Sequence, residues 1–377
     1  MKSAKKFLAG LLLTTLVSTC FSREYFAYLG TYSGKGSAGI YLARYESDTG
    51  KFTPPQLAAE VSNPNFLAVT PNRKFLFAAA DNLGAESKTN SGVVAYAINP
   101  TNGALTRLAA VNCGWRGVCH ISTDATGRWL LAASYNSGAV AALPIAEDGH
   151  IETISAKAVH HGSGANTNRQ ASAHAHAVVT DPANRFVLVP DLGMDKVMSY
   201  HLDATLTPAE PPFTAVAPGS GPRHLEFHPN GKFAYVINEL TSSVTTFAYD
   251  TAHGALKELQ TVPALPAGFT NVSTAAEIIV HPSGKFLYAS NRGHDSIAVF
   301  AVDEVTGKLT LLAHEPTRGK IPRFITLDPA GKFLFALNQD GGNLVTFEVD
   351  ASSGKLKAVN EEIKLASPVC LKFVEKN

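Results

Sequence analysis

The stretch 221–247, GPRHLEFHPNGKFAYVINELTSSVTTF, decides the fold of this chain. Alternating apolar and polar residues, punctuated by Pro, Asn and Gly, predict three short β-strands at 224–227, 232–237 and 243–247. Five further segments repeat this pattern, and an aromatic residue after the first turn anchors each of the six copies: Phe75, Trp129, Phe186, Phe233, Phe286 and Phe333. Successive anchors are 47 to 57 residues apart. A period of about 50 residues predicts the blades of a β-propeller.

The two ends of the chain complete a seventh repeat. Strands are expected at 25–32 and 39–45 with an outer strand after them, but no innermost strand precedes them. At the other end, 367–374 (SPVCLKFV) reads as one inner strand with nothing following it. Pairing this strand with the N-terminal ones closes the ring and protects the sheet edges. The sequence therefore predicts an all-β, seven-bladed β-propeller formed by one domain, 23–377.

The first 22 residues are a targeting segment rather than part of the fold. Three lysines precede an apolar run at 7–17, which is too short to span a bilayer, a task that needs roughly 20 residues. This pattern predicts a secretory signal peptide cleaved after Ser22, and hence an exported protein in the periplasm or outside the cell. The segment ending at Cys20 also resembles a bacterial lipoprotein box, so a lipid anchor at Cys20 stays open as an alternative.

Composition excludes several partners. The chain is 45% hydrophobic and 17% charged, and 32 Lys plus Arg balance 31 Asp plus Glu. A balanced charge gives no support for a nucleic-acid partner or an acidic membrane surface. The odd set of remaining cysteines, Cys113, Cys119 and Cys370, argues against a complete disulfide framework. Cys113 and Cys119 are close enough to bridge, but burial as small apolar residues is the commoner fate.

Polar residues gather at one rim of the predicted ring. When the repeats are aligned on their aromatic anchors, the start of each inner strand and the turn after each second strand lie on the same face. If these positions were purely structural, the repeats would carry the same apolar side chain at each of them. The aligned positions hold polar side chains instead: His176, Arg223, Arg323, His120, His224, Glu277, Glu239 and Arg292. Polar side chains that converge on a concave surface are the default prediction for a binding site.

Two other interpretations of these residues compete with that of a binding site. His174 and His176 share a strand face and could form a metal pair, but a catalytic zinc needs a third protein ligand and none stands out. Arg223, Glu239 and Arg292 could form a structural ion-pair network. Buried charges are costly unless they are paired or used, and their convergence with His176 favours function. We expect no metal and no cofactor.

Three segments carry a family resemblance. GPRHLEFHPNGKFAYVINEL, EIIVHPSGKFLYASNRGHDSIAVF and PRFITLDPAGKFLFALNQDGGNLVTF resemble the repeats of the seven-bladed propeller lactonases, which include bacterial 6-phosphogluconolactonase and the fungal carboxy-cis,cis-muconate lactonizing enzyme. The resemblance covers residues 25–374. It implies a metal-independent site built from one His, two Arg and one Glu, which fall on His176, Arg223, Glu239 and Arg292.

The function that this resemblance implies is hydrolysis of a sugar lactone, 6-phospho-glucono-1,5-lactone or a related aldonolactone, to the aldonate. His176 or Glu239 is expected to act as general base, while Arg223 and Arg292 hold the anionic group of the substrate and stabilise the developing oxyanion. The expected substrate-binding neighbours are His120, His174, His224, Glu277 and Arg323. We expect a monomer with a small-molecule lactone as its partner.

Alternative functions remain open on the sequence. One is muconate-type ring closure or opening, and another is a non-catalytic propeller that binds an anionic sugar or a protein partner. Because phosphorylated gluconolactone is a cytoplasmic metabolite, an export signal also leaves open which lactone is the natural substrate.

Overall fold

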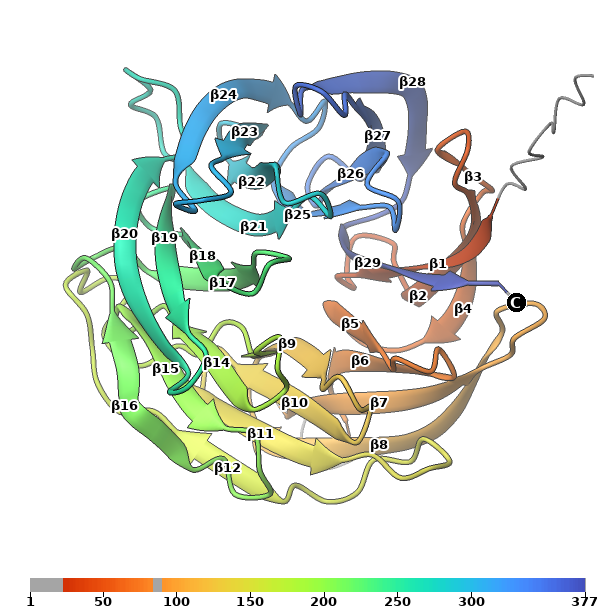
Figure 1. The fold of residues 1–377 in the computed structure, drawn as a ribbon. Coiled ribbons are helices and arrows are strands. Elements are labelled where there is room, and N and C mark those ends of the chain that lie inside the picture. The colour runs from red at the N-terminus through yellow and green to blue at the C-terminus, as the bar shows by residue number, and fades with distance from the viewer. Residues whose placement is uncertain (1–22, 84–89, 377) are drawn as a thin grey trace, which may run out of the picture.

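The computed structural model describes residues 23–83 and 90–376, and these form a ring of seven antiparallel β-sheets (Figure 1). The predicted seven-bladed propeller is confirmed. The expected signal segment, 1–22, lies outside the described residues. Within the described part of the chain, no helix has the length and apolar character needed to cross a membrane.

Six of the blades are four-stranded meanders, and the inner strands of all seven surround the middle of the ring (Figure 1). The three blades of the first half are β5 (Phe66–Val69), β6 (Phe75–Asp81), β7 (Ser91–Ile98), β8 (Leu105–Trp115); β9 (Val118–Thr123), β10 (Trp129–Ser134), β11 (Ala139–Pro144), β12 (Ala156–Val159); β13 (Val179–Thr180), β14 (Phe186–Asp191), β15 (Lys196–His201), β16 (Pro208–Ala215). The next three are β17 (Pro222–Phe227), β18 (Phe233–Asn238), β19 (Ser243–Asp250), β20 (Ala255–Pro263); β21 (Thr274–Val280), β22 (Phe286–Arg292), β23 (Ser296–Val302), β24 (Leu309–Pro316); β25 (Pro322–Leu327), β26 (Phe333–Asn338), β27 (Asn343–Val349), β28 (Leu356–Lys364).

The seventh blade joins the two ends of the chain. Strand β29 (Pro368–Glu375) takes the inner position and pairs with β1 (Glu24–Thr31), from Tyr25 opposite Glu375 to Thr31 opposite Pro368. Outside β1 lie β2 (Gly39–Glu46) and, both paired with β2, β3 (Lys51–Phe52) and β4 (Gln56–Glu60). The predicted closure of the ring is confirmed. Cys113, Cys119 and Cys370 are all unpaired, in agreement with the favoured interpretation.

The repeated aromatic anchors explain why neighbouring blades pack in register. Strand β18 is buried along its whole length because both of its faces pack on other blades. The ring of Phe233, at its start, covers Gly307 in the outer turn of the next blade, where a Cβ atom would lie only 2.5 Å from the ring. Tyr235 donates its hydroxyl to the carbonyl of the same glycine at 3.1 Å. Other blades repeat this contact, which fixes the rim positions relative to one another.

One inner strand is shorter than the sequence predicts. Regular pairing in β13 covers only Val179–Thr180, whereas the inner strand was expected to begin at residue 176. The Asp191 side chain accepts the N–H of His174 at 2.8 Å, and Ala175 forms a single bridge with Asp191. The N–H of His176 still reaches the Pro190 carbonyl at 2.9 Å, so His176 keeps its place at the rim without a regular strand.

Candidate active site

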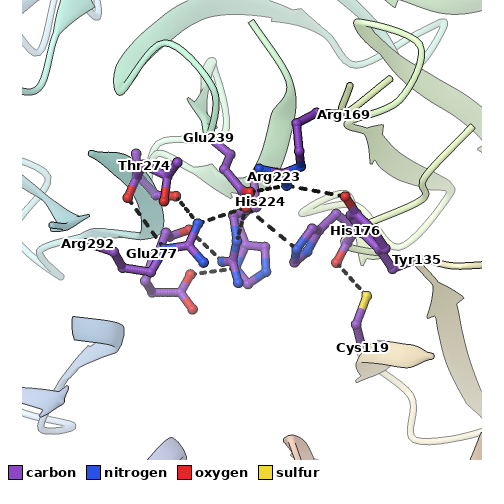
Figure 2. A network of polar contacts seen from close by, with 12 residues as sticks. Cys119, Tyr135, Arg169, His176, Arg223, His224, Glu239, Thr274, Glu277 and Arg292 are labelled. Carbon is purple, nitrogen blue, oxygen red and sulfur yellow. Dashed lines mark hydrogen bonds and ion pairs between the residues drawn. The ribbon is translucent and has the colours of Figure 1, made fainter. Parts of the chain in front are cut away.

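Three arginines and one histidine meet around a single buried carboxylate. Glu239, directly after β18, is 4% exposed and lies 3.2 Å from Arg223 Nε, 2.8 Å from Arg292 Nη2 and 2.6 Å from Arg169 Nη2 (Figure 2). His176 Nε2 lies 4.0 Å from the same carboxylate. The structure thus brings together the four residues that the family resemblance indicates, and it adds Arg169.

The two deeper arginines are held by the backbone of β21 as well as by the carboxylate. Arg223, on β17 beside a register shift, donates Nη1 to the Ala276 carbonyl at 2.6 Å. Arg292, the last residue of β22, donates Nη2 to the Ala275 carbonyl at 2.8 Å. Both guanidinium groups are therefore fixed in place before any ligand arrives, which is what an oxyanion-stabilising group requires.

The cluster carries an excess of positive charge. Burial alone would raise the pKa of Glu239, but Arg292, Arg223 and Arg169 outweigh it and lower that pKa to about 2. Burial together with Arg323 and Arg292 lowers the pKa of Arg223 to about 9, which leaves it a cation at neutral pH. Three guanidinium groups thus share one carboxylate, and the surplus charge suits an anionic ligand.

Arg169 is the functional candidate that the sequence analysis missed. It lies in the loop between β12 and β13, and its side chain is 40% exposed, whereas those of Arg223 and Arg292 are largely buried. Besides Glu239, it contacts the Tyr135 hydroxyl at 3.3 Å. No repeat pattern marks this position, because the loop belongs to only one of the blades.

A buried polar network anchors the loop that carries Arg169. His160 Nδ1 lies 2.6 Å from Asp191 Oδ2, and its Nε2 lies 2.9 Å from the Tyr200 hydroxyl. In the middle of the loop, next to Arg169, the side chain of Gln170 donates to Asp195 at 2.7 Å. Since these groups are buried, the loop is fixed to the blade at its start and beside Arg169.

The two histidines considered above as a metal pair, His174 and His176, have different surroundings. His176 is buried, and burial together with Arg223 and His224 holds its pKa well below the usual value, so its ring is neutral at pH 7. His174 stacks on Tyr135 with ring centroids 4.3 Å apart and contacts the Tyr135 carbonyl at 2.8 Å. No three His, Cys, Asp or Glu side chains in the described ranges are grouped to hold a metal ion.

The remaining predicted neighbours form a second layer inside the ring. His224 Nδ1 lies 2.7 Å from Glu277 Oε1, and the His120 ring centroid lies 5.2 Å from that of His224. These three residues line a cavity of about 370 Å³ between the inner strands. Arg323 stacks over the ring of Tyr32 at 5.4 Å and acts on the cluster through its charge.

Comparison with known proteins gives similarities over almost the whole chain. The profile of the family described as lactonase, 7-bladed beta-propeller, matches residues 26–373. A 6-phosphogluconolactonase of Bacillus subtilis is 38% identical over 93% of this chain and 99% of that protein, and one of Formosa agariphila is 34% identical over 80% and 86%. The solved structure of a periplasmic gluconolactonase of Pseudomonas aeruginosa matches with a TM-score of 0.88 and 32% identity, covering 94% of this chain and 100% of that one.

Proposed function

Because this chain belongs to the seven-bladed β-propeller lactonase family, we propose that it is a carboxylic-ester hydrolase that opens the ring of a sugar lactone. The observation that carries the proposal is the pair of guanidinium groups of Arg223 and Arg292, fixed between Glu239 and backbone carbonyls at the rim of the ring. The substrate that we favour is 6-phospho-glucono-1,5-lactone or a related aldonolactone, with the aldonate as product.

The role of the arginines follows from the charge that develops during ester hydrolysis. Attack of water on the lactone carbonyl places negative charge on the carbonyl oxygen. Arg223 and Arg292 are preorganised cations in a site that is largely shielded from solvent, where such donors are most effective. Glu239 holds both of them in position. Loss of one oxyanion donor typically costs roughly 10²–10³ in kcat.

The proton of the attacking water needs an acceptor, and Glu239 is poorly suited to this task. Three guanidinium groups lower its pKa to about 2 against the effect of burial, so it holds a proton weakly at neutral pH. The neutral imidazoles of His176 and His224 are the bases within the site.

The surplus of positive charge supports an anionic substrate. Arg169 is the exposed member of the cluster, so we assign it to the phosphate or carboxylate of the substrate. The named relatives include both 6-phosphogluconolactonases and a gluconolactonase, and a comparison of the two lactones is therefore informative. Two observations support export: the chain starts with lysines followed by an apolar run, and the similar gluconolactonase of Pseudomonas aeruginosa is periplasmic. We propose that the mature protein, 23–377, acts as a monomer.

The test is turnover of a panel of lactones by the mature protein. We expect acid release from 6-phospho-glucono-1,5-lactone or glucono-1,5-lactone faster than the spontaneous rate, and little activity on a muconate-type dicarboxylate. Arg223→Ala should lower kcat by roughly 10²–10³, whereas Arg107→Ala on the exposed face of β8 should leave it unchanged. Binding of a lactone without acceleration would refute the proposal in favour of a non-catalytic propeller.

A further inference from the structure

A histidine–carboxylate pair lies one layer below the arginine cluster. His224 and Glu277 are 5% and 7% exposed, and their Nδ1 and Oε1 atoms lie 2.7 Å apart (Figure 2). The second polar atom of each, His224 Nε2 and Glu277 Oε2, has no hydrogen-bond partner among the residues that the structure describes. Since nearly all buried polar atoms in proteins are paired, two free atoms on one buried pair require an explanation.

These two residues border an internal space. The pair lines the cavity of about 370 Å³ between the inner strands, together with Ser122, Glu226 and Thr326. The rest of the lining is largely apolar, but a cavity of this size with several polar groups in its wall has room and partners for water. The pair is also close to the cluster: the His224 ring centroid lies 5.3 Å from that of His176, and Arg223 is its neighbour in the chain.

We propose that His224 and Glu277 form the general-base dyad of the lactonase, in which His224 accepts the proton of the attacking water and Glu277 positions its ring. This inference rests on the proposed hydrolase function. The dyad has the geometry of an activated imidazole: the carboxylate accepts the Nδ1 proton, which leaves Nε2 as a free proton acceptor.

The other candidates lack this arrangement. Glu239 is committed to three guanidinium groups. His176 is neutral, but its ring lies 4.0 Å from Glu239, which is beyond hydrogen-bond distance, so no carboxylate fixes its tautomer or stabilises its imidazolium form. His224 alone combines a short contact to a carboxylate with a free second nitrogen among the histidines of the cluster.

The reaction balances without any further reagent. The oxygen of water bonds to the lactone carbonyl carbon while one of its protons moves to His224 Nε2, and Glu277 stabilises the resulting imidazolium. Arg223 and Arg292 stabilise the oxyanion of the tetrahedral intermediate. The intermediate then collapses, the bond from the carbonyl carbon to the ring oxygen breaks, and that oxygen takes the proton back from Nε2. Water has been added across the ester, and the dyad returns to its starting state.

The surroundings of the dyad give it a pH signature. Burial outweighs the nearby Arg223 and raises the pKa of Glu277 to about 7. Burial, with Arg223 and Arg323, lowers the pKa of His224 well below its usual value. The charged and titratable groups that face the pair are Arg223 and Glu226 from β17, His120 from β9, Arg292 from β22, Arg323 from β25, Lys372 from β29, Glu239 and His176. Below about pH 7 Glu277 is protonated, so the dyad holds one proton more than its active form and cannot act as base. We therefore expect kcat/KM to rise with pH through about 7.

The experiment measures pH profiles of kcat/KM for four variants of the mature protein, after subtraction of the spontaneous rate. His224→Gln and Glu277→Gln test the dyad, and His176→Gln tests the competing base. His228→Gln is the matched control. His228 is also a buried histidine, but it lies in the turn at the far end of its blade, where its ring contacts the Gly284 carbonyl of the next blade and the N–H of Asn230. Thermal melting of each variant confirms that it is folded.

The dyad predicts a distinctive set of results. His224→Gln should lower kcat by about 10²–10⁴ with little change in KM. Glu277→Gln should lower kcat and abolish the rise near pH 7, because the introduced amide can donate to Nδ1 and place the remaining proton on Nε2. His176→Gln and His228→Gln should keep that rise. In His224→Ala, added imidazole should restore part of the activity, since the adjacent cavity offers it space.

Other outcomes separate the two proposals. A wild-type protein without lactonase activity refutes the proposed function itself. An active wild type whose His224→Gln variant is folded and equally active overturns the dyad alone. If a histidine variant does not fold, Glu277→Gln decides, because it preserves the shape of the side chain: an unchanged pH profile in that variant also overturns the dyad.

Discussion

Replacing Glu239 with glutamine tests whether one carboxylate holds the site together. Glu239→Gln keeps the shape of the side chain but removes the charge shared by Arg169, Arg223 and Arg292. The variant leaves three guanidinium groups near one another without a counter-ion in a site where Glu239 is 4% exposed. Breaking a buried ion pair by removing one partner is strongly destabilising for this reason.

The magnitude follows from the pKa of the carboxyl group. The arginines lower it from 4.5 to about 2, despite burial, and a difference of that size corresponds to about 3 kcal/mol of stability at neutral pH. A depressed pKa gives stability that is present above about pH 4.5 and is lost as the pH falls toward 2. About 1.5 kcal/mol of the stability that the Glu239 carboxylate gives the wild-type protein should therefore be lost by pH 3.5.

The assay is urea unfolding followed by the fluorescence of Trp115 and Trp129 at pH 7 and pH 3.5. We expect the free energy of unfolding of Glu239→Gln to be about 3 kcal/mol lower than that of wild type at pH 7. At pH 3.5 the difference should be about half as large. Glu304→Gln, in the exposed turn after β23, is the control and should match wild type at both values. A Glu239→Gln protein as stable as wild type, or a gap that does not narrow in acid, would show that the carboxylate does not organise the arginines.

Three further predictions concern the loop, its anchor and the closure of the ring. Arg169→Ala should raise KM for the 6-phosphorylated lactone by roughly 10-fold and for the unphosphorylated lactone much less, because one charge-assisted contact to the phosphate is lost. Equal effects on the two lactones would contradict this role of Arg169. Arg169→Lys should recover part of the affinity. Asp191→Asn removes the charge facing His160. This variant should have a lower melting temperature and, because the Arg169 loop is released, a higher KM. Melting curves and kinetics measured on the same sample check both effects. Truncation after residue 366 removes β29 and should abolish cooperative unfolding in circular dichroism, because β1 then faces the channel unpaired; a cooperative transition would argue against closure by this strand.

The repeats made most of the fold predictable from the sequence. A turn followed by an aromatic residue recurs because each such residue covers a glycine turn of its neighbour, as Phe233 covers Gly307. Alignment on these anchors also placed His176, Arg223, Glu239 and Arg292 on one rim, where the structure finds them in one cluster. The shared geometry of the blades was enough to bring together residues far apart in the chain.

What the sequence could not supply lies where the repeats differ. Arg169 sits in a loop that only one blade has, so no column includes it, and its position depends on side-chain contacts such as that of His160 with Asp191. The link between His224 and Glu277 joins side chains on neighbouring blades. Repeat alignment predicts the face on which each side chain lies, but not which of several polar neighbours it will contact.

The placement of the site within the ring has a physical consequence of its own. The clustered residues come from the blades of β13, β17 and β21 and from the loop before β13, which lie across the ring from the seam between β29 and β1 (Figure 1). On the seam side the channel wall carries the rings of Phe66 and Phe324, and the ammonium group of Lys372 lies 5.2 and 5.8 Å from their centroids. In the proposed binding mode the lactone presents its carbonyl to the arginine side of the channel, opposite these aromatic rings and Lys372. The distances between the catalytic candidates are set by contacts between three adjacent blades. A weaker pairing of β29 with β1 at the seam would therefore lower the stability of the whole ring before it changed those distances.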